Sequence, residues 1–297
     1  MAIVLGANQY GKAEIRLLHV SRDGGTHTIR DLNVTVTLSG DLTATHLTGD
    51  NTEVLTTDAQ KNTVFAFAKE HGVDQIEDFA LRLARHFVDS QAAIWFARVA
   101  VEQYPWERLG DHTFCRSGRE VRTAMASYDG RESWMVSGLR DLTLLNSAGS
   151  EFWGFARDRY TTLAETTDRI LATAVNARWR HAGPLPPEPG SQRAVEAGPG
   201  WADSYRSARD TLLAAFADTH SYSLQQTLFA MGQRVLEGRP EIAEIRLSLP
   251  NKHHFEVDMS PFGLENAGEV FYAADRPYGL IEGTVTRDGA PPPGKAW

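Results

Sequence analysis

The chain has 297 residues, 42% of them hydrophobic, which predicts about two domains with buried cores and excludes disorder as the dominant state. Its 30 basic and 38 acidic side chains give a formal net charge of −8, which disfavours binding to nucleic acid or to anionic membrane surfaces. The single cysteine, Cys115, cannot form a disulfide within the chain, and one thiol is too few for a zinc ribbon or an iron–sulfur cluster.

The first half of the chain carries strand and helix signals in alternation. Residues 14–20 and 29–38 flank Asp23-Gly-Gly25 and alternate polar with apolar side chains, which predicts a β-hairpin. Thr57-Asp-Ala-Gln60 has capping-box spacing and predicts a helix over 61–71 with Thr57 as its cap. Apolar side chains at three- and four-residue steps predict a second helix over 76–88, and aromatic and β-branched residues predict strands over 91–103 and 115–128.

The second half has approximately the same order of elements, which favours two similar halves. Strands are predicted over 134–145 and 152–160, helices over 205–216 and 224–236, and closing strands over 242–249, 254–259 and 269–272. The aromatic run Phe152-Trp-Gly-Phe155 is expected in the core. A proline-rich insert occupies 183–200, and residues 287–297 are predicted to form a disordered tail.

The chain shows no cofactor or nucleophile signature, because the glycine-rich dinucleotide motif, the Walker loop and Gly-x-Ser-x-Gly are all missing. The spacing of the ten histidines and the one cysteine does not suit a zinc site. Taken singly, Lys12 is typical of a solvated strand edge, Arg169 of a surface arginine and Gln225 of a first helical turn. His253 and His254 are adjacent on a predicted strand, so only one of them can face a site.

Five segments become specific when they are taken together, because they follow one another in a fixed order. They are Tyr10-Gly-Lys12, Thr57-Asp-Ala-Gln-Lys-Asn-Thr63, Phe152-Trp-Gly-Phe-Ala-Arg-Asp-Arg-Tyr-Thr-Thr-Leu163, Thr167-Asp-Arg-Ile-Leu171 and Leu249-Pro-Asn-Lys-His-His-Phe255. This combination resembles the urate oxidase (uricase) family. The resemblance runs from Tyr10 to Tyr272, with the insert and the tail outside it.

The resemblance implies an α+β chain of two tandem tunnelling-fold (T-fold) domains, over 1–138 and 139–286, followed by the tail. Each domain would be an antiparallel four-stranded sheet with helices on one side, and four chains would assemble into a barrel-like tunnel. The implied reaction is the oxidation of urate by dioxygen and water to 5-hydroxyisourate and hydrogen peroxide, without metal or organic cofactor. The implied partners are urate, dioxygen and further copies of the chain, with no nucleic acid and no membrane.

The resemblance also implies roles for individual residues. Lys12, Thr57 and His253 would relay protons, because a desolvated lysine can act as a base on a threonine hydroxyl and a histidine can move the second proton. Arg169 and Gln225 would grip one edge of urate, and Phe152 would stack on its ring. Asn251 would position dioxygen or water. The remaining contacts would be main-chain groups of Thr57 and Asp58 at the opposite edge, and of Leu224, where the family commonly has valine.

Each site is expected to straddle an interface, with Thr57 from one chain and the other residues, Lys12 among them, from its neighbour. Two alternatives remain open. The first is a tunnelling-fold enzyme acting on a pterin or guanine nucleotide, and the second is a non-catalytic purine-binding oligomer. The ending Lys295-Ala-Trp297 differs from the peroxisomal Ser-Lys-Leu address, so a bacterial-type cytoplasmic protein is expected.

Overall fold

A computed structural model of the chain describes residues 2–182, 185 and 200–297. Most of the proline-rich insert therefore lies outside the described residues. The first half contains β1 (Tyr10–Ser21), η1 (Asp23–Gly25), β2 (Thr28–Gly40), α1 (Thr43–Thr48), α2 (Thr57–His71), α3 (Ile76–Asp89), β3 (Ile94–Tyr104), β4 (Trp106–Arg108), β5 (Phe114–Arg116) and β6 (Val121–Tyr128). The second half contains β7 (Ser133–Asn146), β8 (Leu171–His181), α5 (Trp201–Asp218), α6 (Leu224–Gly238), β9 (Ile242–Glu256), η2 (Ser260–Phe262) and β10 (Phe271–Thr286).

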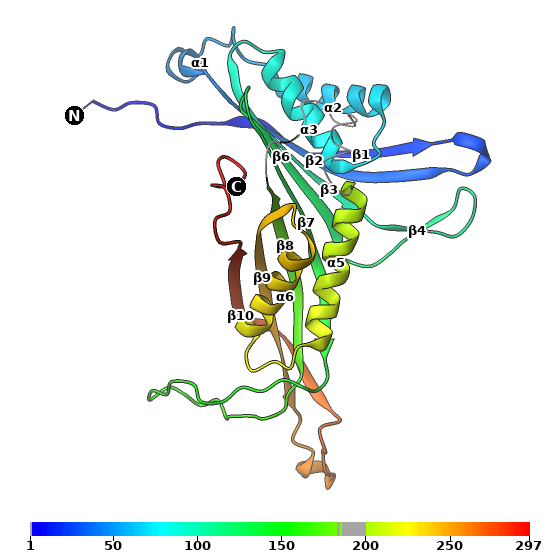
Figure 1. The fold of residues 1–297 in the computed structure, drawn as a ribbon, viewed down its shortest axis with the longest axis vertical. Coiled ribbons are helices and arrows are strands. Elements are labelled where there is room, and N and C mark those ends of the chain that lie inside the picture. Colours follow the sequence, from blue (N-terminus) through cyan, green and yellow to red (C-terminus); the bar gives the residue numbers. More distant parts are fainter. Residues whose placement is uncertain (1, 183–184, 186–199) are drawn as a thin grey trace.

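Eight of the strands form one antiparallel sheet in the order β1-β2-β3-β6-β7-β8-β9-β10. The fold is thus α+β, as expected, but the two four-stranded units are joined edge to edge through β6 and β7. The sheet is open, with β1 and β10 as its edges, and the small β4–β5 ribbon lies apart from it. Figure 1 shows the elongated result, with α1 to α3 at one end and the tip between β9 and β10 at the other.

The long helices pack on one face of this sheet (Figure 1). A row of directly paired, buried residues crosses that face from β3 to β10, and it consists of Val101, Ala124, Ser137, Trp179, Ile245 and Val285. Cross-strand partners point to the same side of a sheet, so the helix-covered face is continuous. None of the helices within the described ranges has the length and apolar character needed to cross a bilayer.

Two hydrophobic clusters fill the space between the sheet and the helices. The first extends to Met135 and includes α3, whose apolar face is buried at Ile76, Phe79, Leu83 and Phe87 as its periodicity predicts. The second begins at Leu139 and includes α5 and α6. The clusters therefore separate within β7, the strand that contains the expected 138/139 boundary.

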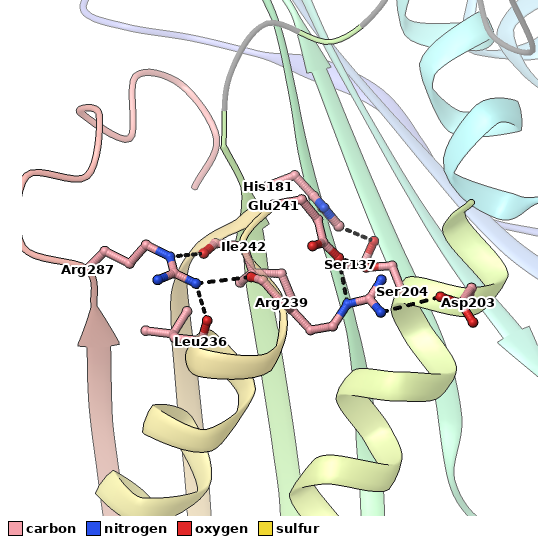
Figure 2. Close-up of polar contacts among 9 residues, drawn as sticks. All are labelled: Ser137, His181, Asp203, Ser204, Leu236, Arg239, Glu241, Ile242 and Arg287. Carbon is pink, nitrogen blue, oxygen red and sulfur yellow. Dashed lines mark hydrogen bonds and ion pairs between the residues drawn. The ribbon is translucent and has the colours of Figure 1, made fainter. Parts of the chain in front are cut away.

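A buried polar network lies where the two halves meet (Figure 2). His181 Nε2 lies 3.1 Å from Ser137 Oγ, which in turn donates to Glu77 of α3 at 2.9 Å. Close by, Arg239 pairs with Glu241 at 2.7 Å and with Asp203 of α5 at 3.3 Å. Burial lowers the pKa of His181 to about 4, so this histidine is neutral at pH 7.

Three sequence-based predictions differ from the structure in the second half. Residues 152–160 form a loop whose exposed Trp153 lies outside any core, because Gly154 and several charged side chains interrupt the aromatic run. The strand in this region is instead β8, which the sequence analysis missed. The predicted strands at 242–249 and 254–259 are one strand, β9, which passes through Pro250, and the short strand at 269–272 is the start of the long β10.

The segment 287–297, expected to be disordered, packs against the sheet. Ala296 is buried, Arg98 donates to the main-chain oxygen of Trp297 at 2.7 Å, and Lys295 pairs with Asp129 at 3.3 Å. The Arg246 guanidinium lies 3.8 Å from the centroid of the Trp297 ring. These aromatic and ionic contacts hold the segment in a defined position, although its glycine- and proline-rich composition indicates disorder.

Candidate active site

Lys12 and the start of α2 lie together at one end of the elongated molecule. Tyr10 and Lys12 point to the same face of β1, because they are two residues apart on a strand. The Tyr10 hydroxyl donates to the main-chain oxygen of Leu55 at 3.0 Å, two residues before Thr57. The strand and the helix start are thereby fastened to each other, and Lys12 is brought close to Thr57 and Asp58 of the same chain.

The hydroxyl of Thr57 is not used for helix capping. The expected cap was Thr57, but the structure gives that role to Thr56, whose Oγ1 accepts from the Ala59 N–H at 3.1 Å. Thr57 is the first helical residue, and among the described residues its hydroxyl has no hydrogen-bond partner. The capping explanation for this side chain is therefore wrong, and the hydroxyl remains available for chemistry.

Asp58 is engaged through its side chain rather than open to a ligand. Its carboxylate pairs with Lys61 at 2.5 Å and accepts from Asn62 at 2.9 Å. The hydrogen bond from Lys61 is the main cause that lowers the pKa of Asp58, and the charge of Lys12 contributes as well. Asp58 can therefore offer a ligand its main-chain N–H, which is unpaired at the first turn of a helix.

Arg169 and Phe152 lie together at the opposite end of the elongated molecule. The Arg169 guanidinium lies 4.9 Å from the centroid of the Phe152 ring, and its Nε donates to Ser150 Oγ at 3.3 Å. Within the described ranges Arg169 has no carboxylate partner, and burial lowers its pKa. A half-buried guanidinium with unused Nη donors is suited to bind a planar anion.

The start of α6 lies beside this pair. Ser150 and Ser221 form a bridge, and the Glu151 N–H donates to the Ser221 oxygen at 2.7 Å. Ser223 caps α6 by accepting from the Gln226 N–H at 3.1 Å, which leaves the N–H groups of Leu224 and Gln225 as the free donors of the first turn. Leu224 is buried and Gln225 is exposed.

Asn251 and His253 reach the same end on β9. Asn251 is paired with Thr173 of β8, a strand that begins two residues after Arg169. Asn251 and His253 share one face of β9, and the His253 ring stacks on Phe255 with centroids 5.8 Å apart. Adjacent His254 points to the other face, with Nδ1 3.1 Å from the Lys252 oxygen.

The candidate residues therefore form two groups within one chain. Group A is Lys12, Thr57 and Asp58, and group B is Phe152, Arg169, Leu224, Gln225, Asn251 and His253. Strands β1 and β9 are six positions apart in the sheet, which at the usual spacing is about 29 Å along the sheet. One small ligand cannot bridge that distance. The expectation that Lys12 acts from the same chain as group B is wrong, since the structure puts Lys12 with Thr57.

Neither group lines the large cavities that the described part of the chain contains. Two large cavities among the described residues, of about 730 and 700 Å³, are lined by other residues. Within the described ranges no cluster of three or more histidine, cysteine, aspartate or glutamate side chains could hold a metal ion. Each group combines a helix start with a cation, Lys12 in one and Arg169 in the other, and each is called a half-site below.

Two residues that the sequence analysis missed have clear structural roles in these half-sites. Tyr10 fastens β1 to the segment before α2, and Ser150 accepts from Arg169. Tyr10 belongs to the first of the five segments that carry the resemblance, and Ser150 lies two residues before Phe152. Their positions beside the recognised segments were the available signal, but their partners are distant in sequence or depend on loop geometry.

The chain is similar to uricases both in sequence and in structure. A family model described as Uricase matches residues 8–127 and 135–282. Uricase from Arthrobacter globiformis is 53% identical over 290 residues, covering 97% of this chain and 91% of that protein, and uricase from Danio rerio is 35% identical, covering 94% and 93%. The crystal structure of the Arthrobacter globiformis uricase has a TM-score of 0.92 at 51% identity, covering 100% of this chain and 99% of that one. Urate oxidase from Bacillus sp. TB-90 shares the fold, with a TM-score of 0.79 at 24% identity over 94% of this chain and 100% of that one.

Proposed function

Because this chain belongs to the uricase family and is therefore an enzyme that oxidises urate, we propose that it converts urate, dioxygen and water to 5-hydroxyisourate and hydrogen peroxide at a site shared between two copies of the chain. Arg169 is the observation that carries this proposal. It is a half-buried guanidinium over an aromatic ring, with its Nε fixed and no carboxylate partner among the described residues. An anionic, planar, purine-like substrate matches that environment.

The substrate would be held between two helix starts. Group B supplies the Arg169 fork, the Gln225 carboxamide and the free N–H groups of the first turn of α6. Group A of a second copy supplies the N–H groups of Thr57 and Asp58 at the start of α2. Helix N-termini favour anions, so both edges of urate meet donors and partial positive charge.

The ring of urate would stack on Phe152. Phe155 lies nearly parallel to Phe152, with an interplanar angle of 16° and centroids 5.1 Å apart. This is the geometry of a stacked ligand ring. We place urate at this position, with Phe155 moving aside as the loop 152–166 packs against the second copy.

The proposed reaction depends on proton transfer and uses no nucleophile from the protein. Ground-state dioxygen is a triplet and reacts slowly with closed-shell molecules, so the enzyme must make urate a better electron donor. Lys12 would accept a proton through the Thr57 hydroxyl, and His253 would move the second proton between water and the oxidised ring. Asn251 would hold dioxygen or water above the ring, and a dry interface would keep the charges effective.

In a barrel-like tunnel of four copies, each copy would supply group A to one site and group B to another. Each chain carries one group A and one group B, so a symmetric assembly can complete every site. The open sheet edges β1 and β10 and the exposed aromatic side chains near the β9–β10 tip, such as Phe255 and Tyr272, suit burial between copies.

The test is to follow urate absorbance, oxygen uptake and peroxide in the same reaction. The proposal requires one dioxygen consumed and one peroxide formed for each urate lost. A purine-binding oligomer without activity would bind urate and leave its absorbance unchanged, and an enzyme for pterins would leave urate intact. Lys12→Ala should abolish turnover, whereas Lys69→Ala, at the far end of α2, serves as the matched control.

A further inference from the structure

The guanidinium of Arg169 is held at its Nε by one fully buried hydroxyl group. Ser150 has no exposed surface, and its Oγ accepts from Arg169 Nε at 3.3 Å. Arginine has five N–H donors in a rigid plane. A contact at Nε uses one of them and leaves both Nη groups free, so the contact fixes the orientation of the plane without occupying the end that would bind a ligand.

Ser150 is itself fixed from two directions. The Ser221 N–H donates to the Gly149 oxygen at 3.0 Å, and the Glu151 N–H donates back to the Ser221 oxygen at 2.7 Å. On the other side, the Gly149 N–H donates to Asp168 Oδ1 at 2.8 Å. Segment 149–151 is therefore joined both to the residue before Arg169 and to the segment that leads into α6.

The connection to α6 is also buried. Thr227 Oγ1, in the first turns of α6, donates to Ser221 Oγ at 2.8 Å, and neither side chain is exposed. A chain of buried hydroxyl groups and main-chain bonds thus joins the support of Arg169 to the helix that carries Gln225. These bonds therefore fix the position of Arg169 relative to the helix that carries Gln225.

We propose that Ser150 is a positioning residue for substrate binding, which orients the Arg169 guanidinium so that its Nη groups and Gln225 meet the same edge of urate. This inference rests on the proposed function of Arg169. Bidentate binding by a guanidinium is sensitive to small errors in angle and distance. A supporting hydroxyl that restricts rotation of the guanidinium therefore raises affinity without contacting the ligand.

The experiment compares four variants by urate affinity measured without oxygen, together with KM and kcat in air. Ser150→Ala should weaken affinity about tenfold, as expected for the loss of one hydrogen bond to a charged group. KM should rise accordingly and kcat should change little, because the reacting atoms are not touched. Arg169→Ala should weaken affinity about 30-fold or more. Adding Ser150→Ala to Arg169→Ala should cause no further loss, because the serine acts only through the arginine.

Ser127→Ala is the matched control. Ser127 is buried, and its Oγ accepts from Arg98 Nε at 3.1 Å, so the substitution removes the same type of contact outside the proposed site. It should leave urate affinity unchanged. If Ser150→Ala does not fold, Ser150→Cys, which keeps the volume and weakens the acceptor, gives the same comparison.

The outcomes separate the two hypotheses. Unchanged affinity in Arg169→Ala would remove the proposed role of Arg169 itself. A loss in Arg169→Ala with normal affinity in Ser150→Ala would overturn the positioning role alone. Equal losses from Ser150→Ala in the presence and absence of Arg169 would also overturn it, since they would show a general effect of the substitution on the loop.

Discussion

The hydroxyl of Tyr10 donates to the main-chain oxygen of Leu55 at 3.0 Å, and this bond places Lys12 beside the start of α2 in the same chain. Lys12 and Thr57 therefore belong to one half-site. Group B lies on β9, on the first turn of α6 and on a loop, all in the other half of the chain. Any site that uses both groups must take them from two copies.

Complementation between inactive variants tests this arrangement. Lys12→Ala damages group A and Arg169→Ala damages group B, so each variant alone should be nearly inactive. When the two are unfolded together and refolded, random mixing should leave about a quarter of the sites with both groups intact. Recovery of about a quarter of the wild-type activity is the expected result, measured as urate loss.

The control for this mixture is Lys12→Ala with Thr57→Ala. Both substitutions lie in group A, so every site keeps one lesion and no activity should return. Recovery in this control would show that Lys12 and Thr57 serve a site from different chains. Absence of recovery in the Lys12→Ala and Arg169→Ala mixture, once hetero-oligomers are demonstrated, would argue against a shared site.

Arg169 should depend on its shape as well as its charge. Arg169→Ala should cost on the order of 2 to 5 kcal/mol of urate binding, because it removes a partly buried charged partner. Arg169→Lys should recover only part of that loss, since an ammonium group lacks the planar fork and the Nε contact to Ser150. Calorimetric titration without oxygen measures both, and Arg98→Ala is the control. Full recovery by lysine would mean that charge alone suffices.

Chelation should not stop the reaction. The proposed steps use Lys12, Thr57 and His253, and no step is assigned to a metal. Protein dialysed against a strong chelator, and shown to be metal-free by elemental analysis, should keep its rate of urate oxidation. Loss of activity that one added metal restores would contradict the proposed mechanism.

The sequence indicates the elements of this fold best where one face of an element is buried. The helix α3 has an apolar stripe that periodicity detects, and the hairpin β1–β2 alternates in the same clear way. In contrast, β8 is buried on both faces and contains Ala172, Ala174 and Ala177, so it has neither alternation nor strong strand propensity. The aromatic run at 152–155 led to a strand prediction there, although Gly154 and the charged residues that follow it keep this segment a loop.

The resemblance predicts which residues form the candidate site, but it does not predict how the fold groups them. Tyr10 and Leu55 are 45 residues apart, and only the packing of α2 on β1 brings them together. Thr56 and Thr57 are equally good caps by composition, and backbone geometry decides between them. Such choices depend on contacts between elements, which spacing along the chain does not encode.

Trp297 should contribute measurably to stability. Its ring lies against Arg246 at 3.8 Å and Arg178 at 5.4 Å, and a partly desolvated cation–π contact is worth about 1 kcal/mol. Trp297→Ala should lower the free energy of unfolding in urea by about that amount, and Trp297→Phe should lower it less, because a phenyl ring keeps a weaker contact. Equal stability of wild type and Trp297→Ala would show that the Trp297 ring does not stabilise the packing of this segment on the sheet.

His181 should make the free energy of unfolding depend on pH. Burial lowers its pKa from 6.5 to about 4 in the folded chain. Between these two values the unfolded chain binds a proton that the folded chain does not bind. The contribution is fully present above pH 6.5 and is lost as the pH falls toward 4, a change of about 3 kcal/mol.

Urea unfolding at several pH values between 7 and 4.5 tests this contribution. Wild-type protein should lose stability on acidification more steeply than His181→Gln, because glutamine carries no titrating group at the junction with Ser137. His181→Gln should be less stable than wild type at pH 7, where it disturbs a buried hydrogen bond, and the difference should shrink at low pH. His112→Gln, at an exposed histidine, is the matched control and should follow the wild-type slope. Parallel slopes for wild type and His181→Gln would show that His181 does not resist protonation in the folded chain.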